Sequence, residues 1–123
     1  MTRILVIEND TNLQNMICQS LEENGYEVVI ASDGKEGITR ISNYNPHCVI
    51  TDIHTQIRNG LDIILEIQNN YQTIPVIAIY NENQKDMPDL LATASRFGAY
   101  ATFSLPSENN ELIKKINNAF KPK

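Results

Sequence analysis

The chain has 123 residues and a net charge of −5 at neutral pH, with 41% hydrophobic and 20% charged residues. This length and composition are typical of one globular domain with a complete core, and they exclude a disordered chain. An acidic domain lacks the clustered lysine and arginine side chains on which binding to a nucleic-acid backbone depends. The two cysteines are too few for a disulfide scaffold, and no apolar run approaches the roughly 20 residues of a membrane span, so we expect a cytoplasmic protein with reduced thiols.

Apolar runs and helical patterns alternate along the chain. The apolar runs predict five strands, at residues 4–7, 26–31, 48–50, 76–80 and 101–105. Between and after them, apolar residues at helical spacing predict five helices, which begin near residues 11, 35, 60, 88 and 107. Glycine, proline and asparagine mark the turns between these elements.

The start signals of two helices and the inner face of a third give specific expectations. Thr11 and Gln14 have the spacing of a capping box, which predicts a helix start at Thr11. Ser107 is the expected N-cap of the last helix. The expected inner face of the third helix consists of Leu61, Ile64, Leu65 and Gln68.

The alternation predicts an α/β fold, a doubly wound, five-stranded parallel sheet with the flavodoxin-like order 2-1-3-4-5 and helices on both faces. In such folds, ligands bind at the carboxyl ends of the strands, at the switch point between strands 1 and 3. The first strand ends in Glu8, Asn9 and Asp10, and the third ends in Asp52. These side chains fit a Mg²⁺ site, or a site where Asp52 attacks phosphate as a nucleophile; alternatively, they are ordinary solvated acids.

The chain resembles the receiver domain of two-component response regulators from end to end. The matching stretches are Ile4–Asp10, Leu21–Val28, Ala31–Gly37, Pro46–Asp52, Asn59–Leu61, Ile74–Ile77 and Phe97–Ala99. The resemblance implies that Asp52 accepts a phosphoryl group from a histidine kinase. It also implies that Mg²⁺ is held by the pair after the first strand, here Glu8 and Asn9, and by the backbone carbonyl of His54. Asp10 and Asp52 are further candidate ligands.

The sequence departs from the family pattern at several positions of the site. Asn9 is neutral where the family has a second acid. Leu105 stands before Pro106, at the position of the family's lysine. Tyr80 stands where the family has threonine or serine at the end of the fourth strand, and Thr102 stands where it has an aromatic residue.

These departures weaken phosphoryl transfer, which depends on positioning and on cations that neutralise the charge of the equatorial oxygens. Leu105 supplies no cation, and Asn9 removes one charge from the Mg²⁺ ligands. Arg58 and Lys85, on nearby loops, are candidates to replace the missing cation. The segment Thr55–Gln56 replaces the Met-Pro that usually follows the phosphoacceptor loop.

We therefore expect residues 1–123 to form a single receiver domain, with no output domain in this chain. It is expected to be a signalling interaction module and not an enzyme, with weak Mg²⁺ binding and weak or absent phosphorylation at Asp52. The alternative is a working phosphoacceptor receiver, phosphorylated on Asp52 by a histidine kinase with Mg²⁺. The expected partner is a histidine kinase or another signalling protein, bound through the face formed by the fourth helix, fifth strand and fifth helix. Neither nucleic acid nor a membrane is expected as a direct partner.

Tyr80 is large where the family has a small residue, and Thr102 is small where the family has an aromatic one. This exchange affects whether the domain can change conformation on phosphorylation. In the resembling family these two positions rearrange together when phosphate binds. Here the Tyr80 ring either fills the channel between strands 4 and 5 and fixes one arrangement, or it points to solvent and shields the pocket. Tyr80 and Leu105 are expected to border the same pocket, and the resemblance implies a cis bond between Leu105 and Pro106.

Overall fold

Parallel strands and helices alternate in the computed structural model, which describes residues 1–54, 60–83 and 89–121. The strands are β1 (Arg3–Ile7), β2 (Glu27–Ala31), β3 (Cys48–Asp52), β4 (Val76–Asn81) and β5 (Ala101–Leu105). The helices are α1 (Thr11–Glu23), α2 (Gly34–Tyr44), α3 (Gly60–Asn70), α4 (Asp89–Arg96) and α5 (Asn109–Phe120). The strands form one five-stranded parallel sheet in the order β2-β1-β3-β4-β5, which confirms the predicted α/β, flavodoxin-like fold.

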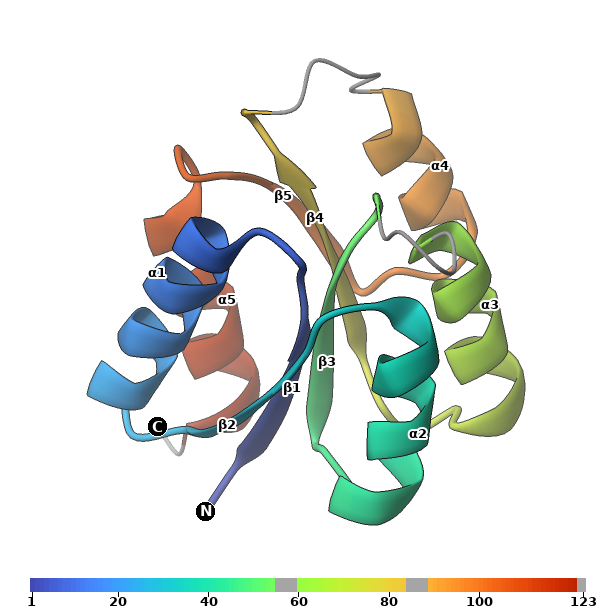
Figure 1. Ribbon diagram of the computed structural model, residues 1–123, viewed down its shortest axis with the longest axis horizontal. Helices are drawn as coiled ribbons and strands as arrows, with labels where there is room; N and C mark the ends of the chain where they lie inside the picture. The colour runs from blue at the N-terminus through green and yellow to red at the C-terminus, as the bar shows by residue number, and fades with distance from the viewer. Residues whose placement is uncertain (55–59, 84–88, 122–123) are drawn as a thin grey trace.

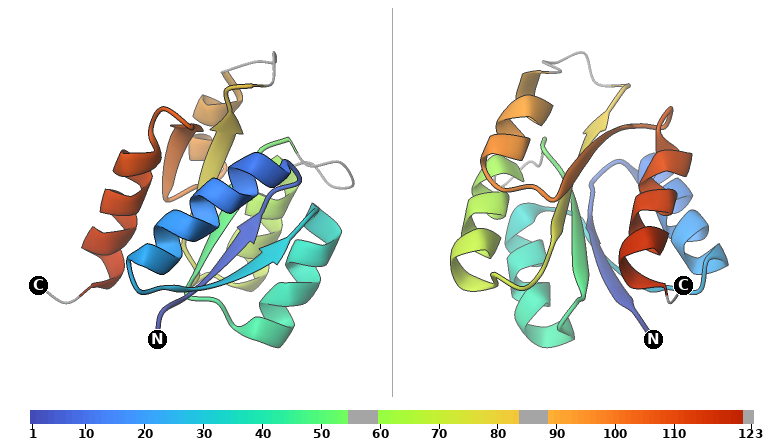
Figure 2. Two further views of the ribbon diagram at one scale, coloured as in Figure 1. Left: turned by 60° about the vertical axis from the view of Figure 1, so that its left-hand side comes forward. Right: turned by 180° about the vertical axis from the view of Figure 1, so that it is seen from behind.

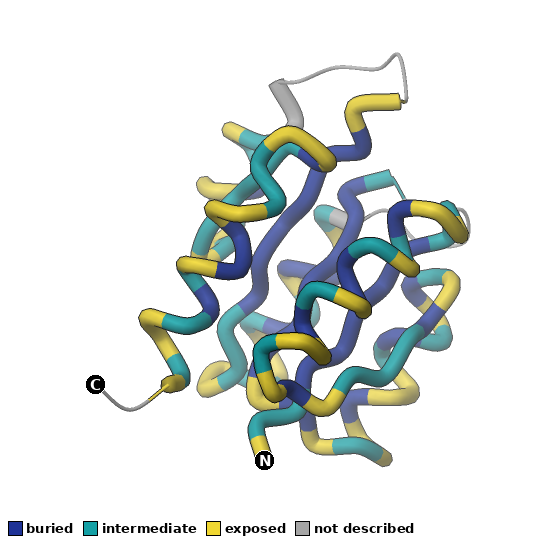
Figure 3. The backbone as a smooth tube through the Cα atoms, turned by 90° about the vertical axis from the view of Figure 1, so that its left-hand side faces the viewer, coloured by how far each residue is buried: buried dark blue, intermediate teal, exposed yellow. Residues whose placement is uncertain are grey.

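Two layers of helices enclose the sheet. Helices α1 and α5 cover one face, and α2, α3 and α4 cover the other (Figure 1, Figure 2). Each face has its own cluster of buried apolar side chains. The central strands are buried along their length, whereas the helices carry the exposed residues (Figure 3). This burial on both faces explains why the strands read as continuous apolar runs.

The alternation of side chains along β1 determines the face of the sheet to which the polar residue after this strand points. Ile4 and Val6 belong to the cluster beneath α1 and α5, whereas Leu5 and Ile7 belong to the cluster beneath the other three helices. Because successive side chains of a strand point to opposite faces, the next residue falls on the α1–α5 side. That residue is Glu8.

The first helix begins at Thr11, as predicted, but its capping residue differs from the prediction. Its N-cap is Asp10, whose Oδ1 accepts a hydrogen bond from the backbone N–H of Leu13 (3.1 Å). The Gln14 side chain donates to the carbonyl of Glu8 (2.6 Å) and so does not complete a capping box with Thr11. The capping-box prediction is wrong because Asp10, one residue earlier, offers a charged acceptor to the positive end of the helix.

The last helix begins later in the sequence than predicted. Helix α5 starts at Asn109, and its N-cap residue is Glu108. Ser107 is therefore not the N-cap, and its hydroxyl instead donates to Glu82 (2.6 Å). The Glu108 carboxylate accepts from the backbone N–H of Ser104 (2.7 Å) rather than from the helix.

The inner face of α3 is offset by one residue from the prediction. Ile63, Ile64 and Ile67 are buried, whereas Leu65 is 40% exposed. The helix carries apolar residues on two neighbouring arcs, and each residue turns the helix by about 100°, so the apolar pattern alone does not select the buried arc.

Both cysteines, Cys18 and Cys48, are buried free thiols. The helices within the described ranges include none that is long and apolar enough to cross a membrane.

Candidate functional site

Two buried carboxyl groups meet at the carboxyl ends of β1 and β3. Glu8 directly follows β1, and Asp52 is the last residue of β3. The register pairs the preceding residues, Ile7 and Thr51, so the two acids are lateral neighbours. Both are 0% exposed. The pKa of each carboxyl group depends on the other, so the structure brings these two predicted site residues together.

The environment of the pair favours retention of a proton. Burial raises the pKa of Glu8 to about 9, and the hydrogen bond to Asp52 and the negative charge of Asp52 add to this shift. Burial also raises the pKa of Asp52, although hydrogen bonds from Glu8 and from the backbone of His54 act in the opposite direction. The pair therefore holds one proton at neutral pH when no cation is bound.

One oxygen of each acid is held by a backbone N–H. The N–H of Asp10 donates to Oε2 of Glu8 (3.1 Å), and the N–H of His54 donates to Oδ1 of Asp52 (2.8 Å). Within the described ranges, no protein group donates a hydrogen bond to the other two oxygens, Oε1 of Glu8 and Oδ2 of Asp52, and both are buried. A proton held by the pair or a bound cation would satisfy them.

The two residues after Glu8 lie at the rim of the pair. Asn9 is half-buried. Both carboxylate oxygens of Asp10 accept hydrogen bonds, Oδ1 from the N–H of Leu13 and Oδ2 from the side-chain amide of Asn81 (3.0 Å). These two bonds lower the pKa of Asp10. Asp10 is therefore a helix cap and a link to β4.

Tyr80 is buried on the other face of the sheet. It is 9% exposed and packs in the apolar cluster beneath α2, α3 and α4, which includes Ala94. The His54 ring meets the Tyr80 ring edge-on, with 6.1 Å between centroids and an interplanar angle of 62°. The alternative in which Tyr80 points to solvent is wrong, because the ring has an apolar pocket available beneath the helices.

Leu105 and Tyr80 do not border one pocket, contrary to the prediction. Leu105 is 0% exposed and lies in the cluster beneath α1 and α5. The register pairs Asn81 with Leu105 and Tyr80 with Ser104, so Tyr80 and Leu105 are one step out of phase and point to opposite faces. The Leu105–Pro106 peptide bond is cis, as predicted.

The position of the family's lysine therefore contributes no charge to the acid pair. Leu105 occupies it as a core residue. Across the described ranges, neither Glu8 nor Asp52 forms a salt bridge, and the ion pair present there joins Arg40 and Glu36 on α2. Nor do these ranges contain a group of three or more His, Cys, Asp or Glu side chains with the geometry of a metal site.

Several sequence predictions fall on residues outside the described ranges. The candidate replacement cations, Arg58 and Lys85, both lie there, and so does the segment Thr55–Gln56. Thr102 lies within the described part, half-buried on β5 and paired with Ala78.

Sequence reasoning missed the role of Asn81, which lies just past the predicted strand at residues 76–80. Asn81 is the last residue of β4 and is 1% exposed. Its side chain donates to Asp10 (3.0 Å) and accepts from the N–H of Asn83 (2.9 Å). Extending the strand alternation by one residue past Tyr80 would have placed it on the same face as the acids.

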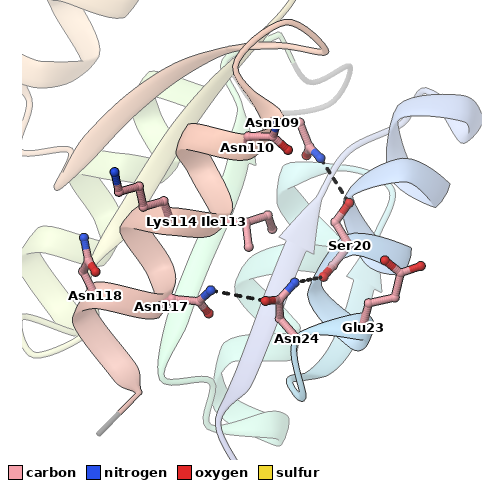
Figure 4. Close-up of a pocket in the computed structure, with 9 residues that line it drawn as sticks. All are labelled: Ser20, Glu23, Asn24, Asn109, Asn110, Ile113, Lys114, Asn117 and Asn118. Atoms are coloured by element: carbon pink, nitrogen blue, oxygen red, sulfur yellow. Dashed lines mark hydrogen bonds between the residues drawn. The ribbon is translucent and has the colours of Figure 1, made fainter. Parts of the chain in front are cut away.

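A groove of about 460 Å³ lies between α1 and α5, and neither Glu8 nor Asp52 lines it (Figure 4). Asparagine side chains dominate its lining, and Ser20 and Asn109 bridge its two helices with a hydrogen bond of 3.1 Å. This groove is therefore separate from the acid pair.

A flavodoxin-like domain with a carboxyl pair at the switch point of its sheet has the architecture of a signalling receiver. The family model of the response regulator receiver domain matches residues 4–117. The chain therefore belongs to the response regulator receiver family.

Curated relatives and solved structures agree with this family. The chain is 33% identical over 116 residues to "Response regulator ArlR" of Staphylococcus saprophyticus, covering 94% of this chain and 51% of that protein. It is 30% identical over 118 residues to "Probable transcriptional regulator ycf29" of Pyropia yezoensis, covering 94% of this chain and 52% of that protein. The chain thus spans about half the length of these two relatives.

Among solved structures, a response regulator receiver domain from Clostridium thermocellum superimposes with a TM-score of 0.82 at 31% identity, covering 97% of this chain and 94% of that one. A CheY-like receiver domain protein from Methanospirillum hungatei gives a TM-score of 0.85 at 24% identity, covering 97% and 93%, which supports the fold alone.

Proposed function

We propose that this receiver is a divergent signalling interaction module with weak or absent phosphorylation at Asp52, and not an enzyme. The observation that carries the proposal is the burial of Leu105, which is 0% exposed in the α1–α5 core. An apolar side chain fixed there offers no positive charge to a phosphoryl group on Asp52. Since fixed cations supply much of the stabilisation in phosphoryl transfer, the site is expected to accept phosphate slowly.

The acid pair nevertheless fits a divalent cation. Oε1 of Glu8 and Oδ2 of Asp52 are buried, and no protein group in the described part of the chain donates a hydrogen bond to them. Carboxylate, amide and carbonyl oxygens are suitable ligands for Mg²⁺, so Asn9 and the carbonyl of His54 are further candidates. A bound Mg²⁺ would supply positive charge between the acids and toward a phosphoryl group. The neutral amide of Asn9 lowers the charge of this ligand set, so we expect weak binding.

The retained acids support a second candidate, a working phosphoacceptor. In that case Asp52 takes the phosphoryl group from a histidine kinase, and Glu8 with the neighbouring oxygens holds Mg²⁺. The two buried oxygens, Oε1 of Glu8 and Oδ2 of Asp52, favour this candidate, because a bound cation would take the place of the proton that the pair otherwise holds. The two candidates differ in rate, and one experiment separates them.

The experiment measures phosphorylation with a small phosphodonor and Mg²⁺, followed as a mass gain of one phosphoryl group. The parent chain is compared with Asn9→Asp, Leu105→Lys and the double variant. Each restored contact is expected to raise the rate by about 10²-fold. Leu105→Gln controls for the disturbance of the core by a polar side chain, and Asp52→Asn controls for the phosphorylated residue. A parent chain that reacts as fast as the double variant would establish the working phosphoacceptor instead.

We propose that the partner, a histidine kinase or another signalling protein, binds the face formed by α4, β5 and α5. Tyr100, just before β5, is 49% exposed, and the Nζ of Lys115 on α5 lies 5.0 Å from its ring centroid. Exposed aromatic residues such as Tyr100 are enriched in protein contact surfaces. A cytoplasmic location, where a kinase would be met, remains part of this proposal.

A further inference from the structure

Three side-chain links connect α1, the end of β4 and the start of α5. One joins Asp10 to Asn81, the second joins Glu82 to Ser107, and the third joins Asn109 to Ser20. Asp10 caps α1 and Ser20 lies on α1, so the first and third links both end on this helix. Asn81 is next to Glu82 in the sequence, and Ser107 is two residues before Asn109. The three links and these short stretches of chain therefore form a closed circuit. We call these three links the rim ring.

The first link fixes the end of β4 to the start of α1. Asn81 donates from Nδ2 to Oδ2 of Asp10 at 3.0 Å. Its Oδ1 accepts from the N–H of Asn83 at 2.9 Å, so the amide is engaged at both ends. Asn81 is 1% exposed, which protects the link from competing water.

The second link fixes the residue after β4 to the turn before α5. The Glu82 carboxylate accepts from the N–H of Ser107 (2.7 Å) and from its hydroxyl (2.6 Å). The N–H of Glu82 also donates to the carbonyl of Leu105 (2.8 Å). Three short bonds, two of them to a carboxylate, therefore hold these two segments together.

The third link closes the circuit between α5 and α1. The amide of Asn109 donates to the hydroxyl of Ser20 at 3.1 Å (Figure 4). Further along the same helices, Asn117 donates to Asn24 (3.2 Å) and accepts from the hydroxyl of Tyr26 (2.6 Å). Helix α5 is thus attached to α1 at two levels.

We propose that the rim ring is a conformational lock, so that the segment after β4 and the start of α5 move only together with α1. In a closed circuit, no segment leaves its place unless two links break. The inference rests on the proposed function, since it explains how an interaction module presents α5 in one arrangement whatever the state of Asp52. Tyr80, buried on the opposite face, holds the same strand end from the other side.

The test exchanges the partners of the first link. Asn81→Asp places a second carboxylate against Asp10, and the pair should separate. Combining it with Asp10→Asn restores one donor and one acceptor, and the new amide oxygen can still cap α1 because asparagine is a good N-cap. Amide hydrogen exchange is measured by NMR on the full chain, without Mg²⁺ or a phosphodonor, at Asn83 and at Ser107.

The lock predicts an effect across the ring. Asn81→Asp should speed exchange at Ser107 by about fivefold, the loss expected for a typical hydrogen bond, although Ser107 does not touch Asn81. The exchanged pair should return the rate to that of the parent. Asn118→Asp, the same change on the exposed side of α5, should have no effect. Unchanged exchange at Ser107, or failure of the exchanged pair to restore it, would overturn the lock.

A second variant cuts the ring elsewhere if Asn81→Asp does not fold. Asn109→Ala removes the third link and should speed exchange at Asn83, on the far side of the ring. Exchange at Asn83 that equals that of the parent would refute the closed circuit. These measurements need no phosphoryl group, so their outcome does not depend on whether Asp52 is phosphorylated slowly or readily.

Discussion

Replacement of Glu8 by glutamine tests how the buried acid pair sets stability. Burial raises the pKa of Glu8 from 4.5 to about 9, so the folded protein holds a proton that the unfolded chain releases at neutral pH. An acid whose pKa is raised in the fold makes the free energy of unfolding larger at low pH than at high pH. The contribution of Glu8 is therefore lost as the pH rises from 4.5 toward 9. The slope is about 1.4 kcal/mol per pH unit, so the loss between pH 4.5 and neutrality is about 3 kcal/mol.

Glutamine avoids this loss while keeping the contacts of the pair. Its oxygen can accept from the N–H of Asp10, and its amide can donate to Asp52, with no proton taken up. We expect Glu8→Gln to raise the free energy of unfolding at pH 7 by up to about 3 kcal/mol and to flatten its pH dependence. Urea unfolding in the presence of a chelator, at several pH values, measures this. Glu23→Gln, exposed on α1, is the matched control.

The reasoning would be refuted if the parent protein gained stability between slightly acidic and slightly alkaline pH. It would equally be refuted if Glu8→Gln were less stable than the parent at alkaline pH, since that would show that the carboxylate of Glu8 is favoured in the fold.

Three further predictions concern the metal, the core and a helix cap. Mg²⁺ should raise the thermal midpoint of the parent protein, because a ligand that binds only the folded state stabilises that state. The increase should be larger at alkaline than at acidic pH, and the midpoint of Asp52→Asn should hardly change. Calorimetry with and without Mg²⁺ measures this. Ile63→Ala should lower the free energy of unfolding by about 2–5 kcal/mol and Leu65→Ala by less than about 1 kcal/mol, because only Ile63 is buried; urea unfolding distinguishes them. Asp33→Ala should lower it by about 1 kcal/mol, because the Asp33 carboxylate accepts from the N–H of Glu36 at the start of α2; Asp33→Asn should retain most of the stability.

The sheet could be predicted because its strands are buried on both faces. A continuous run such as Ile4–Ile7 has few alternatives in a chain with regular helical segments between the runs, and parallel strand order follows from general rules. The approach of Glu8 to Asp52 could be predicted for the same reason, since both acids end neighbouring strands. These features depend on the backbone and on topology.

The details that failed depend on side-chain competition. Asp10 displaced Thr11 as the cap of α1 because a carboxylate is the stronger partner at a helix N-terminus. Ser107 did not cap α5, because Glu82, distant in sequence, offered two acceptor oxygens. A single sequence gives no register between β4 and β5, so it did not show that Tyr80 and Leu105 point to opposite faces.

The acid pair is the part of the molecule that the fold does not need. Replacing two buried carboxyl groups by apolar side chains of similar volume is often neutral or stabilising. Glu8 and Asp52 nevertheless leave two buried oxygens that only a proton or a cation satisfies. This chain has Leu105 at the position of the family's lysine but keeps Glu8 and Asp52. We therefore expect it to retain the capacity to bind a cation at this site. We therefore expect Mg²⁺ and the shared proton to compete for the same two oxygens, so that the affinity for Mg²⁺ rises with pH.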